Sequence, residues 1–172
     1  NVDTLRAFAD EQGLPHVYPP DTPRYRGVCH VALPQEGHVR PGEVIVGTDS
    51  HTCTHGALGA MATGIGNTDA GFVMGTGKLL VKVPPSLRFV INGKLPAHVC
   101  AKDIILRIIG DIGVDGANYC AMEFTGDTIA ALDIEERMTI CNMAIEAGGK
   151  NGIIAPDDKT LDYVRARTEQ PF

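Results

Sequence analysis

A short β-branched run passes directly into polar residues in the stretch Glu43-Val44-Ile45-Val46-Gly47-Thr48-Asp49-Ser50-His51. Residues 43–46, which a glycine follows, predict a buried strand. The polar residues lie where that strand ends, and α/β sheets present catalytic groups at this end of their strands. The stretch therefore predicts an α/β fold with Asp49, Ser50 and His51 at the edge of a sheet.

Predicted helices and strands alternate on both sides of this stretch. The expected helices are 2–11, 101–109, 129–132, 135–147 and 159–167, and the further strands are 87–91, 121–124 and 153–154. This alternation favours an α/β architecture. Because two prolines, Pro84 and Pro85, punctuate the chain, we expect 1–84 to be the end of a first α/β domain and 85–172 a second, smaller α/β domain.

The composition excludes several classes of protein. The 172 residues are 44% hydrophobic and 21% charged, which is typical of a chain with a packed core rather than a disordered one. There are 15 basic and 21 acidic residues, the wrong balance for a surface that binds nucleic-acid phosphates. No apolar run approaches the length of about 18 residues that a membrane span needs. We therefore expect neither nucleic acid nor a membrane as a partner.

The cysteines indicate a reducing compartment. Five of them lie far apart, with no Cys-x-x-Cys pair: Cys29, Cys53, Cys100, Cys120 and Cys141. This spacing fits neither a disulfide framework nor a local run of zinc or iron–sulfur ligands. We therefore expect reduced thiols in a cytoplasmic protein and no metal ligands among the residues of this chain.

Two glycine-rich stretches match nucleotide-binding motifs only in part. The segment Gly64-Ile65-Gly66-Asn67-Thr68-Asp69 lacks the third glycine of a dinucleotide fingerprint, and we expect no strand directly before it. The segment Gly75-Thr76-Gly77-Lys78 lacks the first glycine of a phosphate loop, and Leu79 stands where a hydroxyl should bind magnesium. We expect neither stretch to bind a nucleotide.

The polar residues after the first strand allow more than one interpretation. Asp49, His51 and His55 could together form the mononuclear metal site of a hydrolase. Alternatively, residues 49–51 could be a polar turn that caps the next helix and does nothing more. His30 lies on an apolar run, where a histidine is more often part of the core than a catalyst.

A second polar group lies on the predicted helix 135–147. Asn142 and Glu146 are four residues apart, so they share a helix face, and their neighbours are largely apolar. A buried carboxylate needs a partner because its desolvation is costly. If this face is buried, we expect His51 or His30 beside Glu146; otherwise both residues point to solvent.

Five segments, taken together, carry a family resemblance. They are Gly27-Val28-Cys29-His30, Val46-Gly47-Thr48-Asp49-Ser50-His51-Thr52, Gly56-Ala57-Leu58-Gly59-Ala60, Ala101-Lys102-Asp103-Ile104-Ile105 and Arg137-Met138-Thr139-Ile140-Cys141-Asn142-Met143-Ala144-Ile145-Glu146-Ala147-Gly148. In this order and spacing, from about residue 25 to the end, the chain resembles the aconitase superfamily. Within it, the chain resembles the large subunits of 3-isopropylmalate dehydratases most.

The resemblance implies a hydro-lyase that removes water from a hydroxy-dicarboxylate and adds it back, with a [4Fe-4S] cluster as the Lewis acid. It implies two carboxylate–imidazole pairs, which suit proton transfer to a leaving hydroxyl. The implied catalytic residues are His30 with Asp49, His51 with Glu146, and Ser50; Asn142 is implied to lie near the cluster.

The chain also departs from the family pattern. The family's cluster cysteines lie in a Ser-Cys-Thr-Asn segment and a later Cys-x-x-Cys, and neither occurs in these residues. An upstream histidine–acid pair and the domain or small subunit that grips the substrate carboxylates are also missing. The resemblance therefore implies an internal fragment, inactive alone, whose partners are the remaining large-subunit sequence, a small subunit and the substrate. The cluster ligands would lie outside this chain.

For the complete protein, we expect an isopropylmalate dehydratase large subunit of leucine biosynthesis. The segments Gly110-Asp111-Ile112-Gly113-Val114-Asp115-Gly116-Ala117 and Ala155-Pro156-Asp157-Asp158 resemble that subunit more than aconitase proper. One alternative is the large subunit of a homoaconitase of lysine biosynthesis. Another, from a different class, is a non-catalytic scaffold or partner-binding module in which the same residues are a satisfied polar core.

Overall fold

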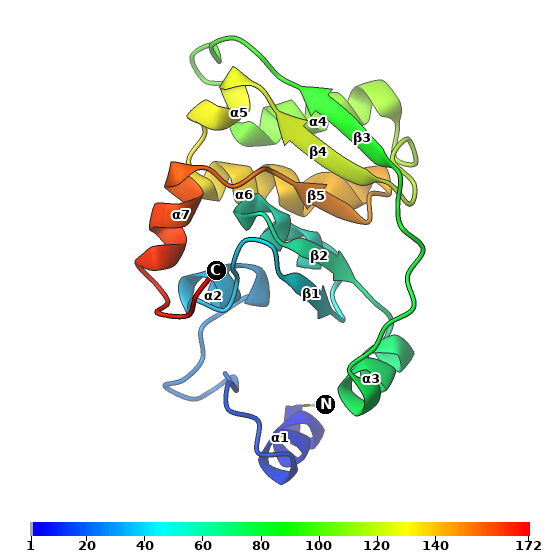
Figure 1. The fold of residues 1–172 in the computed structure, drawn as a ribbon, viewed down its shortest axis with the longest axis vertical. Helices are drawn as coiled ribbons and strands as arrows, with labels where there is room; N and C mark the ends of the chain where they lie inside the picture. Colours follow the sequence, from blue (N-terminus) through cyan, green and yellow to red (C-terminus); the bar gives the residue numbers. More distant parts are fainter. Residues whose placement is uncertain (1) are drawn as a thin grey trace.

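The computed structural model describes residues 2–172 as two parallel sheets with helices between and around them (Figure 1). The first sheet pairs β1 (Val44–Gly47) with β2 (Met61–Gly64), and the second has the order β3 (Ser86–Val90), β4 (Ala121–Thr125), β5 (Asn151–Ile153). The helices are α1 (Val2–Glu11), α2 (Cys29–Gln35), α3 (Asn67–Thr76), α4 (Ala101–Ile112), α5 (Asp127–Ala131), α6 (Ile134–Asn142) and α7 (Asp158–Arg165). The predicted α/β class is confirmed.

Two 3₁₀ segments, η1 (Ser50–Leu58) and η2 (Met143–Ala147), complete the fold. η1 follows β1 and packs against β2, β5 and α6, so it lies between the two sheets. The backbone N–H of Ile154, just beyond β5, donates to the Gly56 carbonyl across 3.0 Å. Residues 52–58 are all buried. The segment that carries the predicted site residues is therefore anchored in the core at one end.

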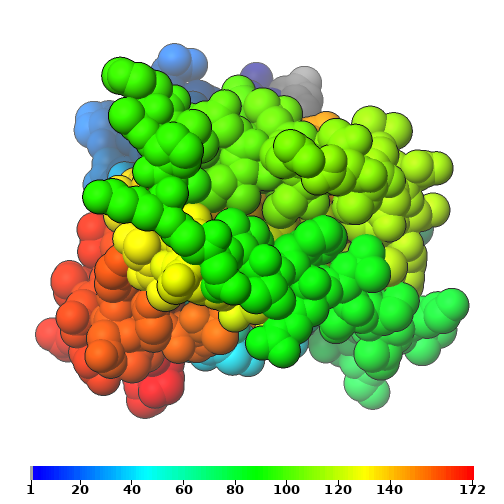
Figure 2. All heavy atoms as spheres, turned by 90° about the horizontal axis from the view of Figure 1, so that it is seen from above, coloured from blue at the N-terminus to red at the C-terminus, as the bar shows by residue number. Residues whose placement is uncertain are grey.

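A single hydrophobic cluster contains residues from both halves of the chain, including Leu58, Phe124, Ile140 and Val164. In the view of Figure 2, the segment from β3 through α4, coloured green, spreads over the top of the molecule. α1 and α3 lie away from this cluster, at the lower end of the view in Figure 1. The division into two domains at residues 84 and 85 stays a prediction.

The expectation of a buried first strand was wrong. Val44 is 75% exposed, and the other residues of β1 are only half-buried. Among the described residues, β1 has a strand on one side only, and this leaves its other edge open. The β-branched pattern thus predicted the strand correctly but not its exposure to solvent.

The expectation that no strand precedes Gly64-Ile65-Gly66 was also wrong. β2 runs directly into it, and Gly66 is the N-cap of α3. The strand Met61-Ala62-Thr63-Gly64 has one β-branched residue, so its pattern is weak. The other stretch, Gly75–Lys78, ends α3, with Gly77 at φ +67°, whereas a phosphate loop precedes its helix.

The predicted helix 135–147 is interrupted. α6 ends at Asn142, and η2 continues to Ala147, where Gly148 at φ +83° stops the turn. Asn142 and Glu146 therefore do not share one face of a regular α-helix. No helix among residues 2–172 combines the length and apolar character that crossing a membrane requires.

Candidate active site

The first pair of site residues joins α2 to the end of β1. His30 lies in the first turn of α2, and its Nε2 donates to Asp49 Oδ1 across 3.0 Å. The His30 side chain is only 12% exposed, whereas that of Asp49 is 55% exposed. The other ring nitrogen of His30, Nδ1, lies 3.6 Å from the Cys29 sulfur. The imidazole is thus held on both sides.

Asp49 also caps η1. Its Oδ1 accepts a hydrogen bond from the backbone N–H of His51 at 2.8 Å. This N–H, followed by the neighbouring His30 imidazole, lowers the pKa of the Asp49 carboxyl. The capping role is therefore present in addition to the contact with His30, and the carboxylate stays ionised at neutral pH.

The second pair joins residues that are 95 positions apart in the sequence. His51 Nε2 donates to Glu146 Oε1 across 3.0 Å. On the other side of the ring, Ser50 Oγ lies 3.1 Å from His51 Nδ1. Glu146 is 52% exposed, so of the two alternatives its carboxylate faces solvent, and it still has His51 as a partner. The partner is thus not explained by desolvation.

The two pairs form one connected group. Asp49 Oδ1 is 3.0 Å from His30 Nε2 and 3.5 Å from His51 Nδ1, and the two imidazole ring centroids are 6.1 Å apart. Three separate segments, α2, the β1–η1 junction and η2, supply these side chains. An arrangement of two imidazoles and two carboxylates can hold and pass protons at neutral pH.

Asn142 is linked to this group through hydrogen bonds with residues of η1. Its Nδ2 donates to Thr54 Oγ1 at 2.9 Å, and Thr54 Oγ1 donates to the His51 carbonyl at 2.6 Å. Cys53 Sγ donates to the Asn142 carbonyl at 3.4 Å. Burial raises the pKa of the Cys53 thiol to about 11, so this thiol is neutral at pH 7. Asn142 therefore ties α6 to the backbone of η1.

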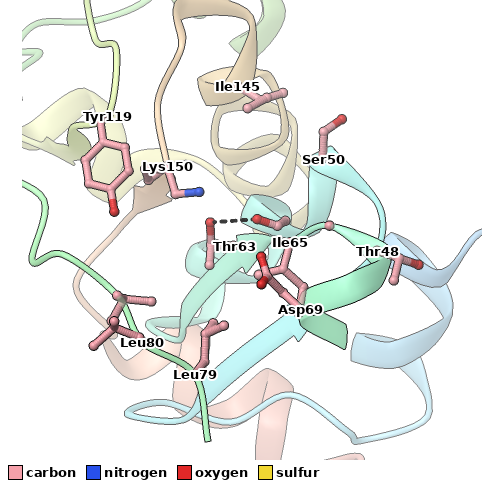
Figure 3. Close-up of a pocket in the computed structure, with 13 residues that line it drawn as sticks. Thr48, Ser50, Thr63, Ile65, Asp69, Leu79, Leu80, Tyr119, Ile145 and Lys150 are labelled. Atoms are coloured by element: carbon pink, nitrogen blue, oxygen red, sulfur yellow. Dashed lines mark hydrogen bonds between the residues drawn. The ribbon is translucent and has the colours of Figure 1, made fainter. Parts of the chain in front are cut away.

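The connected group borders two pockets. One, of about 340 Å³, is lined by His30, Thr54 and Asn142 together with α6 side chains. The other, of about 450 Å³, is lined by Ser50 and Ile145 and by the ends of β1 and β2 (Figure 3). Its lining includes Lys150, which the sequence analysis did not single out. The sequence feature that could have pointed to Lys150 is its position directly after Gly148 and Gly149.

The hydrolase alternative does not fit this geometry. Among residues 2–172, no three histidine, cysteine or acidic side chains gather in a way that could hold one metal ion. His55 is 1% exposed and lies beside His30, with ring centroids 6.2 Å apart. Burial, and then the neighbouring His30, lowers the pKa of His55 to about 4. His55 is therefore a neutral core histidine and not part of a metal triad with Asp49 and His51.

The cysteines do not fit as ligands of an iron–sulfur cluster. All five are free thiols, two of them exposed, one half-buried and two buried. Burial raises the pKa of Cys53 and of Cys141, which opposes the thiolate form that binds iron. Within the described part of the chain, the cysteines form no grouped ligand set.

Comparison with known proteins gives a consistent result. The model of the Aconitase family (aconitate hydratase) matches residues 1–172. The chain is 60% identical to the chloroplastic 3-isopropylmalate dehydratase large subunit of Arabidopsis thaliana, with 100% of this chain and 35% of that protein covered. It is 58% identical to a probable 3-isopropylmalate dehydratase large subunit of Methanothermobacter thermautotrophicus, with 98% and 39% covered.

A second protein of Methanothermobacter thermautotrophicus, a probable methanogen homoaconitase large subunit, is 56% identical over 97% of this chain and 38% of its own length. The chain thus spans 35 to 39% of the length of these relatives. The match to the family model covers all of this chain, residues 1–172. The chain therefore belongs to the aconitase family.

Proposed function

We propose that the complete protein is the large subunit of a hydro-lyase that dehydrates and rehydrates isopropylmalate in leucine biosynthesis. The observation that carries the proposal is the connection of His30, Asp49, His51 and Glu146 through contacts of 3.0 to 3.5 Å. The names of the most similar relatives support isopropylmalate as the substrate. The free thiols support a cytoplasmic setting.

The proposed chemistry follows from the two pairs. Dehydration breaks the C–O bond and a C–H bond on the neighbouring carbon, and a base takes that C–H proton as the C=C bond forms. The hydroxyl leaves as water once it gains a proton, and a positioned acid lowers the barrier to that step. Glu146 holds His51 Nε2, and Asp49 holds His30 Nε2, so each carboxylate fixes the orientation of one imidazole. We assign the proton transfer to these four residues, with Ser50 at the substrate. In the reverse direction the same group takes the proton back from water.

We also propose that the complete protein binds a [4Fe-4S] cluster through cysteines outside this chain, with Asn142 near it. When bound, the cluster supplies a Lewis acid for the hydroxyl. The other proposed partners are the remaining large-subunit sequence, a small subunit and the hydroxy-dicarboxylate substrate. The relatives are named large subunits and are much longer than this chain, which supports both protein partners.

Homoaconitase is the second candidate, because one relative at 56% identity carries that name. Reconstitution of the complete protein with its small subunit, followed by measurement of kcat/KM for isopropylmalate and for homocitrate, separates the two. We expect isopropylmalate to be preferred. A preference for homocitrate contradicts the proposed substrate, and turnover of neither compound supports the non-catalytic module.

A further inference from the structure

The pocket of about 450 Å³ is formed by segments that are distant in the sequence. Thr48 follows β1, and Thr63 to Gly66 lie at the end of β2 and the start of α3; the loop residues 79–81 form another wall. Tyr119, Ile145 and Lys150 close it from the second half of the chain. Gly64 has no space for a side chain, because a Cβ there would lie 2.8 Å from the Asp49 carbonyl oxygen. The ends of the two strands are thus packed tightly under the pocket.

Lys150 brings a positive charge into this pocket. Figure 3 shows its ammonium group pointing inward, toward Thr63. Among the described residues Lys150 forms no ion pair; its nitrogen lies 5.5 Å from the centre of the Tyr119 ring. The side chain is half-buried. A half-buried ammonium without a carboxylate partner favours binding of an anion.

The other lining groups restrict which anion fits. Asp69, in the first turn of α3, also lines the pocket, so it disfavours two negative charges concentrated on one group of the ligand. Ile65, Leu79 and Leu80 add apolar surface. One ammonium, one carboxylate and several hydroxyl and apolar groups suit one carboxylate of a small organic acid better than phosphate, because the acid carries apolar carbon and phosphate concentrates its charge on one centre.

The pocket adjoins the His51–Glu146 pair. Ser50 lines the pocket, and its Oγ lies 3.1 Å from His51 Nδ1. Ile145 lines it as well and directly precedes Glu146. The pocket therefore shares Ser50 with the hydrogen-bonded group around His51.

We propose that Lys150 binds one carboxylate of the hydroxy-dicarboxylate substrate in this pocket. The inference rests on the proposed function, because it assigns one end of the molecule that the His51–Glu146 pair acts on. Lys150 is a binding residue: it holds the part of the substrate away from the reacting atoms. Such an interaction is the same in the ground state and the transition state, so it affects KM and leaves kcat nearly unchanged.

The test uses the complete protein reconstituted with its small subunit. Lys150→Gln is expected to raise KM for isopropylmalate about tenfold or more, the size of a lost charge-assisted contact, with kcat changed less than about threefold. Lys150→Arg keeps the charge and is expected to restore most of the affinity. The control is Lys94→Gln, which removes an exposed lysine outside the pocket and the site and should leave both constants unchanged. A KM for Lys150→Gln within about twofold of the unaltered protein overturns the proposal.

A second measurement separates this proposal from the proposed function. Calorimetric titration with succinate, a dicarboxylate without a hydroxyl, follows binding in the absence of turnover, and inorganic phosphate is titrated in parallel. We expect succinate binding to weaken about tenfold in Lys150→Gln, even if the protein turns over another hydroxy acid. Equal succinate binding to both proteins, or tighter binding of phosphate than of succinate, contradicts the assignment. Lys150→Met, which keeps the apolar stem beside Tyr119, replaces Lys150→Gln if the latter does not fold.

Discussion

At the scale of single residues, the buried Arg137 joins α6 to the start of α7. Its side chain is 0% exposed, and it donates to both carboxylate oxygens of Asp157, at 2.8 and 2.6 Å. The same guanidinium donates to the Ala130 carbonyl at 3.1 Å. Asp157 is in turn the N-cap of α7. One buried cation therefore joins α5, α6 and the start of α7.

Removing the carboxylate should cost more stability than removing the cation. Asp157→Asn leaves the Arg137 charge buried and unpaired, which we expect to lower the free energy of unfolding by about 2–3 kcal/mol; the 39% exposure of Asp157 limits the loss. Arg137→Met fills a similar volume and leaves Asp157 free to hydrate, at a cost of about 1 kcal/mol. Urea unfolding of both variants measures the difference. The reverse order of the two losses contradicts this account.

Low pH should remove the stability that the ion pair of Arg137 and Asp157 contributes. The Arg137 side chain, which donates to Asp157, lowers the pKa of that carboxyl well below its usual value. A carboxyl whose pKa is lower in the folded chain stabilises the fold above the pKa of the unfolded chain, which is about 3.9. The stabilisation is lost as the pH falls below that value toward the folded-state pKa. Between about pH 4 and pH 2, the unaltered protein should lose stability more steeply than Asp157→Asn.

The cysteines should react at very different rates. Cys100 is exposed, whereas burial raises the pKa of Cys53 to about 11 and also raises that of Cys141. Alkylation requires the thiolate and access to it. Iodoacetamide at pH 7.5 should therefore label Cys100 before Cys53 and Cys141, as peptide mass spectrometry can determine. Early labelling of Cys53 would show that η1 is less tightly packed than described.

At the scale of elements, η1 depends on a close approach of backbones. A Cβ on Gly56 would lie 1.7 Å from the Gly152 carbonyl oxygen, at the point where η1 meets β5. Gly71, in α3, has open space around it. We expect Gly56→Ala to lower the free energy of unfolding by about 3 kcal/mol or more. Gly71→Ala should be neutral or stabilising by about 0.5–1 kcal/mol.

Thermal unfolding of these two variants compares a packed glycine with a free one. A small effect of Gly56→Ala would mean that η1 can move away from β5, and the site residues at its start would then not be fixed. A large loss in both variants would indicate that glycine is needed for backbone freedom in each case rather than for close packing.

The elements that the sequence predicted are those with a clear periodicity. α4 carries a regular apolar stripe, and β3 and β4 are rich in branched and aromatic residues, so their positions were predicted within a few residues. β2 and α3 were missed because small residues and glycines carry little periodic signal. The interruption of the helix after Asn142 depends on contacts with η1, which local sequence does not reveal.

At the scale of the whole molecule, the site is assembled from distant segments. The spacing of polar residues allowed either His51 or His30 as the partner of Glu146, and only the family resemblance selected His51. In the structure, His51 Nε2 lies 3.0 Å from Glu146 Oε1. Lys150 was missed because its role depends on the relative placement of the two sheets. Thr48, which follows β1, and residues 63–66 at the end of β2 form one wall of that pocket, and Lys150 approaches from the other half of the chain.

The central claim, that His51 and Glu146 act as one unit, is tested most directly by a double-mutant cycle on kcat in the complete, reconstituted protein. His51→Asn and Glu146→Gln should each lower kcat by about 10²–10⁴-fold, and the double variant should be no slower than the slower single variant. The control is His98→Asn, which replaces an exposed histidine at φ +70°, a backbone conformation that asparagine tolerates. Losses that multiply in the double variant, or a kcat of Glu146→Gln within about threefold of the unaltered protein, would contradict the claim.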